Sequence, residues 1–360
     1  MKKISGTTRT NLLTYGAVTA AFVILQLLAG GGHISSSLRG QLVPICAYVV
    51  MAVSLNLTVG VLGELSLGHA GFMSIGAFSG VVACLGLENL IPAAPLRLAV
   101  AMVIGAVCAG VAGLLIGIPV LRLKGDYLAI VTLAFGEIIK NIINCLYVGL
   151  DDRGLHVSFL TNSGDLHLAP GGRVVIDGPM GISGVAPIST FTAGFVLILV
   201  TLFVVLNLIH SRAGRAIMAL RDNRIAAESI GIPVTKYKLM AFAVSSALAG
   251  AAGTLYAMNF STVIAGKFSF NTSILILVFV VLGGLGNMWG SIVAATVLTI
   301  LPEALRQFDD YRMLTYAIVL ILVMLATNNP AFKGLLLRLR NKLLPSGAKK
   351  RKGGRADGIS

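Results

Sequence analysis

The sequence predicts an all-α protein that crosses a membrane many times, and three observations support this fold class. The chain of 360 residues is 56% hydrophobic and 12% charged, whereas a soluble domain carries about 25% charged residues. Its mean hydropathy is +0.90. Its apolar residues come in runs of about 20, the length that crosses a bilayer as a helix, and not in the short alternating segments of a membrane β-barrel.

Ten apolar runs are predicted to be transmembrane helices. They occupy residues 11–30, 41–62, 66–86, 96–119, 126–148, 189–210, 238–258, 272–285, 289–302 and 313–328. The first run follows a basic N-terminus, but no clear cleavage site comes after it, so we expect this helix to be retained. The eighth and ninth runs are too close together for two full spans. We therefore expect these two to be short helices, or one of them to be re-entrant.

The basic residues set the predicted orientation. Of the 28 Lys and Arg, 20 lie in four segments beside apolar runs, at residues 1–11, 120–126, 211–238 and 330–360. Basic loops stay in the cytoplasm, and ten crossings place all four segments, and hence both termini, on that side. This clustering explains the net charge of +14 without nucleic acid, for which the chain has no motif.

Residues 1–344 are expected to form a single transmembrane domain. The segment 149–188 should lie outside; it is polar and acidic, and its piece GGRVVIDGP favours a small hairpin. Long loops are often functional, although a simple surface connector fits this segment equally well. Residues 345–360 are basic and rich in Gly, which predicts a disordered tail near anionic lipid headgroups.

The stretch VLGELSLGHAG at 61–71 interrupts the apolar pattern. Its polar and flexible positions are Gly63, Glu64, Ser66, Gly68, His69 and Gly71. Glycine permits close helix contact and non-helical backbone, and non-helical backbone inside a membrane is buried in protein or lines a cavity. The stretch is therefore either a broken helix that binds substrate or a tight turn at the inner boundary, whose Glu and His face water or headgroups.

A second glycine-rich element, VLGGLGNMWG at 281–290, lies in the opposite half of the chain. It also begins with V-L-G and interrupts an apolar run, through Gly283, Gly284 and Gly286. Matched breaks in opposite halves are the pattern of paired discontinuous helices in an inverted repeat.

The fifth predicted span carries charges at mid-membrane. Glu137 and Lys140 are three residues apart, so they lie on one helix face and can pair, and Asn141 extends that face. Charges at this depth are costly and face the bundle interior or a pathway. The pair therefore either forms part of the wall of a translocation path or locks two helices together.

The basic segment 211–238 holds a different kind of element. Ile217–Ile230 is predicted to be one amphipathic helix, which Gly231 ends. Its apolar face comprises Ile217, Leu220, Ala227 and Ile230. A short helix between two spans can lie on the headgroups or dock in the groove of a partner.

Five blocks of the sequence occur in an order known from one family. They are GELSLGHAGFMSIGAF at 63–78, LRLKGDYLAIVTLAFGEIIK at 121–140, SRAGRAIMALRDNRIAAESIGI at 211–232, KLMAFAVSSALAGAAGTLYA at 238–257 and VLGGLGNMWGS at 281–291. Together they resemble the LivM-type permease of bacterial branched-chain amino-acid ABC importers. NPAFKGLL at 329–336 resembles the family's terminal motif.

The resemblance implies a non-enzymatic subunit in the bacterial inner membrane that moves Leu, Ile or Val by alternating access. Its partners would be a homologous LivH-type permease, two cytoplasmic ATPases and an extracytoplasmic binding protein. The chain has no Walker A sequence GxxxxGK[ST], so we expect no cofactor in this chain and ATP bound by the partner subunits.

The resemblance also suggests residue roles. The loop 211–232 looks like the ATPase-coupling region of the family, with a loose match to the EAA---G pattern of ABC importers. Its residues would be Arg215, Arg221, Asp222, Asn223, Ala226, Ala227, Glu228 and Gly231. The expected polar residues of the translocation path are Ser66, His69, Glu137, Asn141 and Ser273. No metal site is expected.

Two other functions stay open at this point. A permease of the same superfamily that carries ribose, a nucleoside, urea or a short amide would share the fold, because fold does not fix substrate. An ion-coupled secondary transporter would use Glu137 as its proton carrier. Dependence of transport on an ATPase distinguishes an ABC permease from such a transporter. A membrane enzyme has less support, since the chain has no HExxH motif, nucleophile elbow or carboxylate–His cluster.

Overall fold

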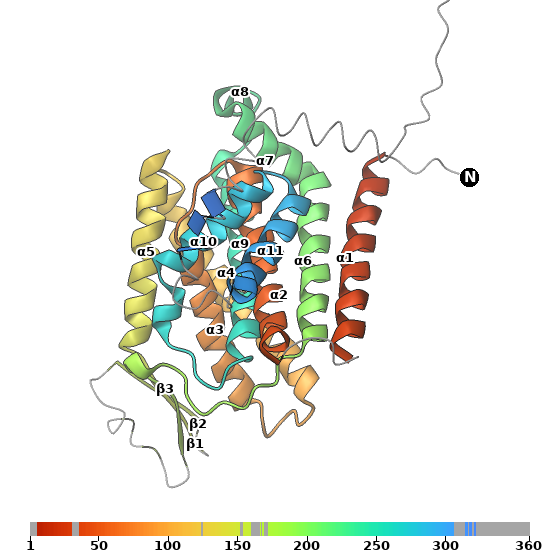
Figure 1. Cartoon of the computed structure of the whole chain (residues 1–360). Coiled ribbons are helices and arrows are strands. Elements are labelled where there is room, and N and C mark those ends of the chain that lie inside the picture. Colours follow the sequence, from red (N-terminus) through yellow and green to blue (C-terminus); the bar gives the residue numbers. More distant parts are fainter. Residues whose placement is uncertain are drawn as a thin grey trace, which may run out of the picture. The chain divides into compact units, whose positions relative to one another are not determined.

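The computed structural model is a bundle of helices with a small β-sheet at one end (Figure 1). It describes residues 6–30, 36–123, 125–151, 154–159, 166, 168, 172–305, 314–315, 317–318 and 320–321. Met1–Ala304 forms one compact unit. Most of the predicted helix 313–328, the terminal motif and the basic tail lie outside the described residues.

Nine of the predicted spans are present among the described residues. They are α1 Gly6–Gly30, α2 Ser36–Asn56 continued by the π-helix η1 Leu57–Leu62, α3 His69–Gly86, α4 Ala94–Val120, α5 Asp126–Asn144, α6 Phe191–His210, α9 Val234–Ala257, α10 Phe270–Gly283 and α11 Met288–Ala304. Five segments, α2 with η1, α3, α4, α6 and α9, are long and apolar enough to cross a membrane. The predicted polytopic helical fold is confirmed. α10 and α11 are short, with 14 and 17 residues.

The segment after α5 is a sheet, which corrects two predictions. The helix expected over 126–148 ends at Asn144, and the chain continues as β1 Tyr147–Asp151, β2 Gly154–Ser158 and β3 Arg173–Asp177, followed by the 3₁₀-helix η3 Gly178–Met180. The strands are antiparallel in the order β2-β1-β3. Within GGRVVIDGP, Arg173–Asp177 is thus one strand paired with β1, and the hairpin lies between β1 and β2. The apolar side chains of YVGL suit a strand as well as a helix, so their pattern did not distinguish the two.

The opposite end of the bundle carries two short helices, α7 Arg212–Asp222 and α8 Arg224–Ser229, and α8 protrudes there (Figure 1). We call the two ends the sheet end and the α7–α8 end. The short 3₁₀-helix η4 Ala265–Phe268 precedes α10.

Small residues hold α3, α4 and α9 together. A Cβ added at Gly76 would lie 2.1 Å from the Gly250 carbonyl oxygen, and one at Gly105 would lie 2.1 Å from Thr254 Oγ1. Thr254 Oγ1 also donates a hydrogen bond of 2.8 Å to the Gly76 carbonyl. Backbone contact of this kind replaces the hydrophobic effect as the source of helix association in lipid.

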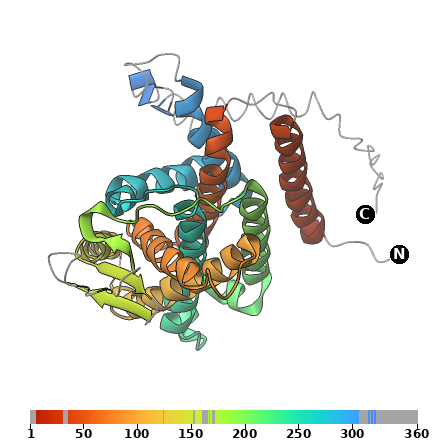
Figure 2. The ribbon, with the colours of Figure 1, turned by 90° about the horizontal axis from the view of Figure 1, so that it is seen from below.

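The helices differ in how much protein surrounds them. Over an apolar stretch of 18 residues in each span, α2 with η1 is 94% buried and α4 is 28% buried. Seen from the sheet end, α1 stands apart from the other helices (Figure 2). Its Phe22 stacks on Phe191 and Phe195 of α6. α2 is therefore the central helix and α4 an outer one.

Candidate functional site

The stretch around residue 64 is a break that reaches the middle of the bundle. η1 ends at Gly63, whose φ is +81°, and the chain stays non-helical until α3 begins at His69. The Leu67 N–H donates to Thr132 Oγ1 at 3.0 Å. A Cβ at Gly68 would lie 2.1 Å from the Thr132 carbonyl oxygen. Thr132 belongs to α5, so the stretch contacts a third helix as well as joining η1 to α3.

Two helices begin side by side at this break. The Ala70 N–H at the start of α3 donates to Ser273 Oγ in the first turn of α10, at 3.1 Å. From here α3 runs toward the sheet end, where Gly86 approaches Leu150 of β1. α10 runs the other way, toward the contact of Gly286 with Gly60. Two helix N-termini, each the positive end of its dipole, therefore meet next to the centre of α5.

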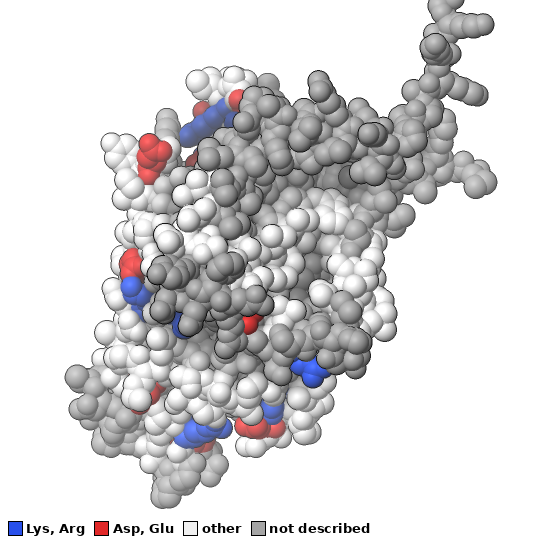
Figure 3. All heavy atoms as spheres, viewed as in Figure 1, with Lys and Arg blue, Asp and Glu red and all other residues white. Residues whose placement is uncertain are grey.

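The predicted ion pair on α5 lies at the same level. Lys140 Nζ is bonded to Glu137 Oε2, and the two side chains are 21% and 32% exposed. The other carboxylate oxygen of Glu137 accepts the Phe270 N–H at 3.2 Å, so it occupies the N-terminus of α10. Asn141 is exposed on the same helix. In Figure 3 an acidic and a basic side chain lie next to each other at mid-height on the side formed by α5.

His69 and Ser66 are both deeply buried. His69 is 2% exposed, and its Nε2 lies 2.8 Å from Ser54 Oγ of α2, so the expectation that it faces water or headgroups is wrong. It joins α3 to α2 in this conformation. Ser66 is 1% exposed, and its Oγ has no hydrogen-bond partner among the described residues.

Glu64 lies close to the start of α9. Its carboxylate pairs with Lys238, and the two side chains are 15% and 6% exposed. The pair is largely shielded from the surface, so Glu64 does not face water freely either. The sequence places Lys238 in the basic segment 211–238 and at the start of the predicted helix 238–258, and it predicts no partner for this residue.

The second break, residues 284–287, meets the first. Gly284 and Gly286 have φ values of +93° and +79°, which glycine adopts without strain. A Cβ on Gly283 would lie 2.4 Å from Ser291 N. Asn56 Oδ1 accepts the Gly286 N–H at 2.8 Å, and Asn56 Nδ2 donates to Ser291 Oγ at 2.9 Å. The two matched glycine elements are thus neighbours in space.

The predicted amphipathic helix Ile217–Ile230 is two helices. Asn223 separates α7 from α8 and caps α8 by accepting the Ala226 N–H at 3.0 Å. Asparagine is a strong N-cap residue, and this signal was present in the sequence. Gly231, with φ +85°, follows α8 as predicted.

The surfaces of α7 and α8 also differ from the prediction. Ile217, Leu220 and Ala227 of the predicted apolar face are buried within the chain itself, whereas Ile230 is 76% exposed and Ile225 is 78% exposed. Glu228 is bonded to Arg224 at 3.0 Å. The other predicted coupling residues that are exposed are Arg215, Arg221, Asp222, Asn223, Ala226 and Gly231. α8 thus presents two large aliphatic side chains outward among charged ones.

Three polar residues of the site were not singled out from the sequence. They are Ser54, Asn56 and Thr132, each of which is at most 2% exposed. The signal that could have revealed them is a hydrogen-bonding side chain inside an apolar run, because such a group needs a partner at that depth.

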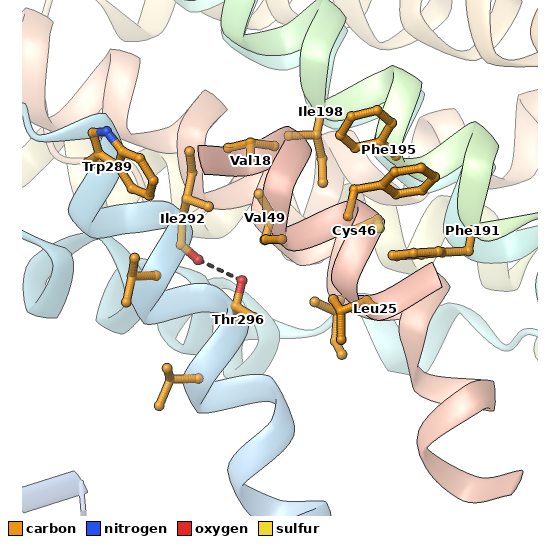
Figure 4. A pocket seen from close by; sticks show the side chains of 15 residues that line it. Val18, Leu25, Cys46, Val49, Phe191, Phe195, Ile198, Trp289, Ile292 and Thr296 are labelled. Atoms are coloured by element: carbon orange, nitrogen blue, oxygen red, sulfur yellow. Dashed lines mark hydrogen bonds between the residues drawn. The ribbon is translucent and has the colours of Figure 1, made fainter. Parts of the chain in front are cut away.

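An apolar cavity of about 220 Å³ lies between α1, α2, α6 and α11. Figure 4 shows that side chains such as Val49, Phe195 and Trp289 line it. The Thr296 hydroxyl bonds to the Ile292 carbonyl of its own helix at 2.8 Å. The cavity therefore offers little to a zwitterion, in contrast to the polar groups beside α5.

The comparison with protein families decides what kind of bundle this is. The family described as "Branched-chain amino acid transport system / permease component" matches residues 37–327. The chain belongs to this family. It is therefore a multi-pass membrane permease with a role in transport.

Individual relatives agree with the family. The chain is 34% identical over 309 residues to the high-affinity branched-chain amino acid transport system permease protein LivM of Salmonella typhimurium, covering 77% of this chain and 66% of that protein. LivM of Escherichia coli is 34% identical over 303 residues, with the same coverage. The chain thus spans just under two thirds of the length of these relatives.

A more distant relative carries a different name. The ribose import permease protein RbsC of Haemophilus influenzae is 26% identical over 289 residues, covering 78% of this chain and 81% of that protein. No solved structure matches the chain.

Proposed function

We propose that this chain is the permease subunit of an ATP-driven importer of branched-chain amino acids in the bacterial inner membrane. It works with a second, similar permease, two cytoplasmic ATPases and an extracytoplasmic binding protein. This chain supplies the translocation path, and ATP is bound and hydrolysed by the ATPases. Membership of the permease family and the two LivM relatives support the proposal.

The observation that carries the proposal is the partly exposed pair of Glu137 and Lys140 in the middle of α5. Charges at membrane depth are stable only where they face protein or water. We infer that this side of α5 faces the second permease and the path between the two subunits. By contrast, the outer side of α4 exposes only apolar side chains such as Val103, Val107 and Leu115, which suit lipid.

The path has groups suited to an amino acid. A carboxylate is stabilised near the N-termini of broken helices, and α3 and α10 both begin here. Glu137 now occupies the N-terminus of α10. In the loaded state the α-carboxylate of the cargo takes that position, and the freed Glu137 accepts the α-ammonium group. Ser66 and Ser273 are the neighbouring hydroxyl groups, and Asn141 continues the polar face.

The α7–α8 end is the docking site of the ATPases. Basic residues gather on α7, α8 and the start of α9, which supports a cytoplasmic location for this end; we assign the N- and C-termini to the same side. Ile225 and Ile230 are exposed on α8, and an aliphatic pair on a short helix fits a groove of a partner. Closure of the ATPases around ATP then drives the permeases between outward and inward access, through their different affinities for the two states.

Uptake by the complete importer tests this function. The importer is reconstituted in proteoliposomes with ATP inside and the binding protein outside, and uptake of radiolabelled leucine is measured. We expect uptake to require both ATP and the binding protein, and to be unaffected by a protonophore. An importer with ATPases defective in hydrolysis is the control.

The same experiment separates the alternatives. Uptake that continues without ATP and collapses with the protonophore would contradict the proposal and indicate an ion-coupled transporter. Uptake of ribose with no uptake of leucine would indicate that the chain is an ATP-driven permease whose cargo is ribose, the sugar in the name of the RbsC relative.

A further inference from the structure

Arg221 on α7 contacts the first helix break directly. Its Nη1 donates to the Gly60 carbonyl in η1 at 3.0 Å. Its Nε and Nη2 both bond to Asp222 Oδ1, at 3.0 and 2.8 Å, which holds the guanidinium in place. A Cβ on Gly63 would lie 2.6 Å from Arg221 Cγ, so the stem of the arginine packs on the glycine that ends η1.

The π-helix makes the Gly60 carbonyl available. In an α-helix the N–H of residue 64 would bond to this carbonyl. Here the Glu64 N–H bonds to the Thr58 carbonyl instead, at 3.1 Å. The arginine therefore supplies a charged donor to a carbonyl at the C-terminal end of a helix, where positive charge is favourable. π-helical turns often occur at functional sites.

Asn56 connects the same point to the second break. A Cβ on Gly60 would lie 1.9 Å from Asn56 Oδ1 and 2.2 Å from Gly286 N. Asn56 is fully buried, and it bonds to Gly286 and Ser291. One arginine, one asparagine and two glycines thus join α7, η1 and the turn between α10 and α11.

α7 itself is firmly attached to the end of α6. A Cβ on Gly214 would lie 2.1 Å from the Leu208 carbonyl oxygen, and Ile217 is fully buried. A displacement of α7 therefore moves Arg221 as part of a rigid element. The Arg221 side chain cannot simply rotate to compensate for this displacement, because its Nη1 is bonded to Gly60 and its Nε and Nη2 are bonded to Asp222.

We propose that Arg221 and Asn56 are positioning residues that transmit movement of α7 to the two helix breaks, and through them to residues 63–68 and α10. Arg221 acts by its bond to Gly60, and not by contact with an ATPase. This inference rests on the proposed function of the α7–α8 end as the ATPase docking site. It assigns η1 as the element that changes its hydrogen bonding between the two access states.

The test measures leucine transported per ATP hydrolysed in proteoliposomes of the complete importer, and co-purification of the ATPases with each variant. Arg221→Met should lower the ratio about tenfold, the effect of losing one charge-assisted hydrogen bond, with the ATPases still bound. Arg221→Lys keeps a donor and should restore part of the ratio. Arg212→Met, which removes the same charge from an exposed position on the same helix, should keep it.

A double mutant sharpens the test. Asn56→Leu should lower the ratio as Arg221→Met does, and the double variant should be no worse than either, because both remove one connection. The proposal is overturned if Arg221→Met keeps the normal ratio, if it loses the ATPases, or if the two substitutions act independently. Failure of the proposed function is recognised separately, since the wild-type importer would then show no ATP-dependent uptake.

Discussion

Two regions of the bundle are held together in different ways. α3, α4 and α9 meet backbone to backbone at glycines such as Gly76, Gly105 and Gly250. The two breaks and α5 meet through side chains, among them Asn56 and Glu137, which bond to backbone N–H groups. Close-packed backbones have few alternative arrangements, whereas hydrogen bonds to non-helical backbone can exchange partners. We therefore expect the first region to be the frame of the permease and the second to contain its moving parts.

The largest effect should follow from a change in the frame. Gly76→Leu places a side chain where even a Cβ would lie 2.1 Å from the Gly250 carbonyl. Overpacking costs about 1–3 kcal/mol, and more where the obstacle is backbone, so we expect almost no folded protein. The yield of monodisperse protein in detergent measures this. The matched control is Gly86→Leu on the same helix, whose Cβ would lie 3.8 Å from the Leu150 side chain. An equal loss of folded protein in both variants would refute this difference between the two glycines.

A change among the moving parts should instead spare folding and reduce transport. Glu137→Gln removes the ion pair with Lys140 and weakens the cap on α10. Hydrogen bonds to charged groups contribute about 1.5–3 kcal/mol, so we expect leucine uptake to fall at least about tenfold with a normal protein yield. The exchange Glu137→Lys with Lys140→Glu should not restore uptake, since a lysine at 137 cannot accept the Phe270 N–H. Full recovery would mean that the pair only locks helices.

A smaller effect should distinguish two serines at the centre of the site. Ser273→Ala removes the acceptor of the Ala70 N–H, which costs about 1 kcal/mol and should lower the melting temperature. Ser66→Ala should not, because Ser66 Oγ has no partner among the described residues. A loss of uptake in Ser66→Ala with unchanged stability would then indicate contact with the cargo. A melting temperature lowered equally by both would show that Ser66 also has a structural partner.

The smallest effect is expected at the surface of α8. Arg224→Ala breaks the ion pair with Glu228, in which both side chains are more than a third exposed. Exposed pairs of this spacing contribute about 0.3–0.5 kcal/mol to stability. The melting temperature should therefore change by less than the error of its measurement. A clear drop in melting temperature would show that α8 contributes to the frame.

The sequence predicted the helices and their breaks better than it predicted the contacts between distant residues. The long apolar runs located nine helices to within a few residues, and the glycines around Gly63 and Gly284 indicated both breaks. Spacing alone was enough for Glu137 and Lys140, which are one turn apart. The pair of Glu64 with Lys238 joins residues 174 positions apart, and that of Asn56 with Gly286 spans 230. A single sequence contains no signal for such pairings.

Local ambiguity explains the other errors. Tyr147–Asp151 continues an apolar run and has β-branched and aromatic residues, so both helix and strand were compatible with it. Ile217–Ile230 is predicted as one helix because the helical spacing of its apolar residues continues past Asn223, the residue that caps α8. The burial of His69 depends on the path of residues 63–68 through the bundle, which its own neighbours in sequence do not reveal.

Labelling from water tests most directly whether the α5 side lines the translocation path. A chain whose four native cysteines are replaced by alanine receives either Asn141→Cys on α5 or Val107→Cys on α4, which is 58% exposed in the isolated chain. Each is treated with a membrane-impermeant thiol reagent in the complete importer, with and without ATP. We predict that the cysteine at 141 reacts to an extent that depends on ATP, while the one at 107 stays unlabelled in lipid. Equal labelling of both, or protection of position 141 in every state, would contradict the account.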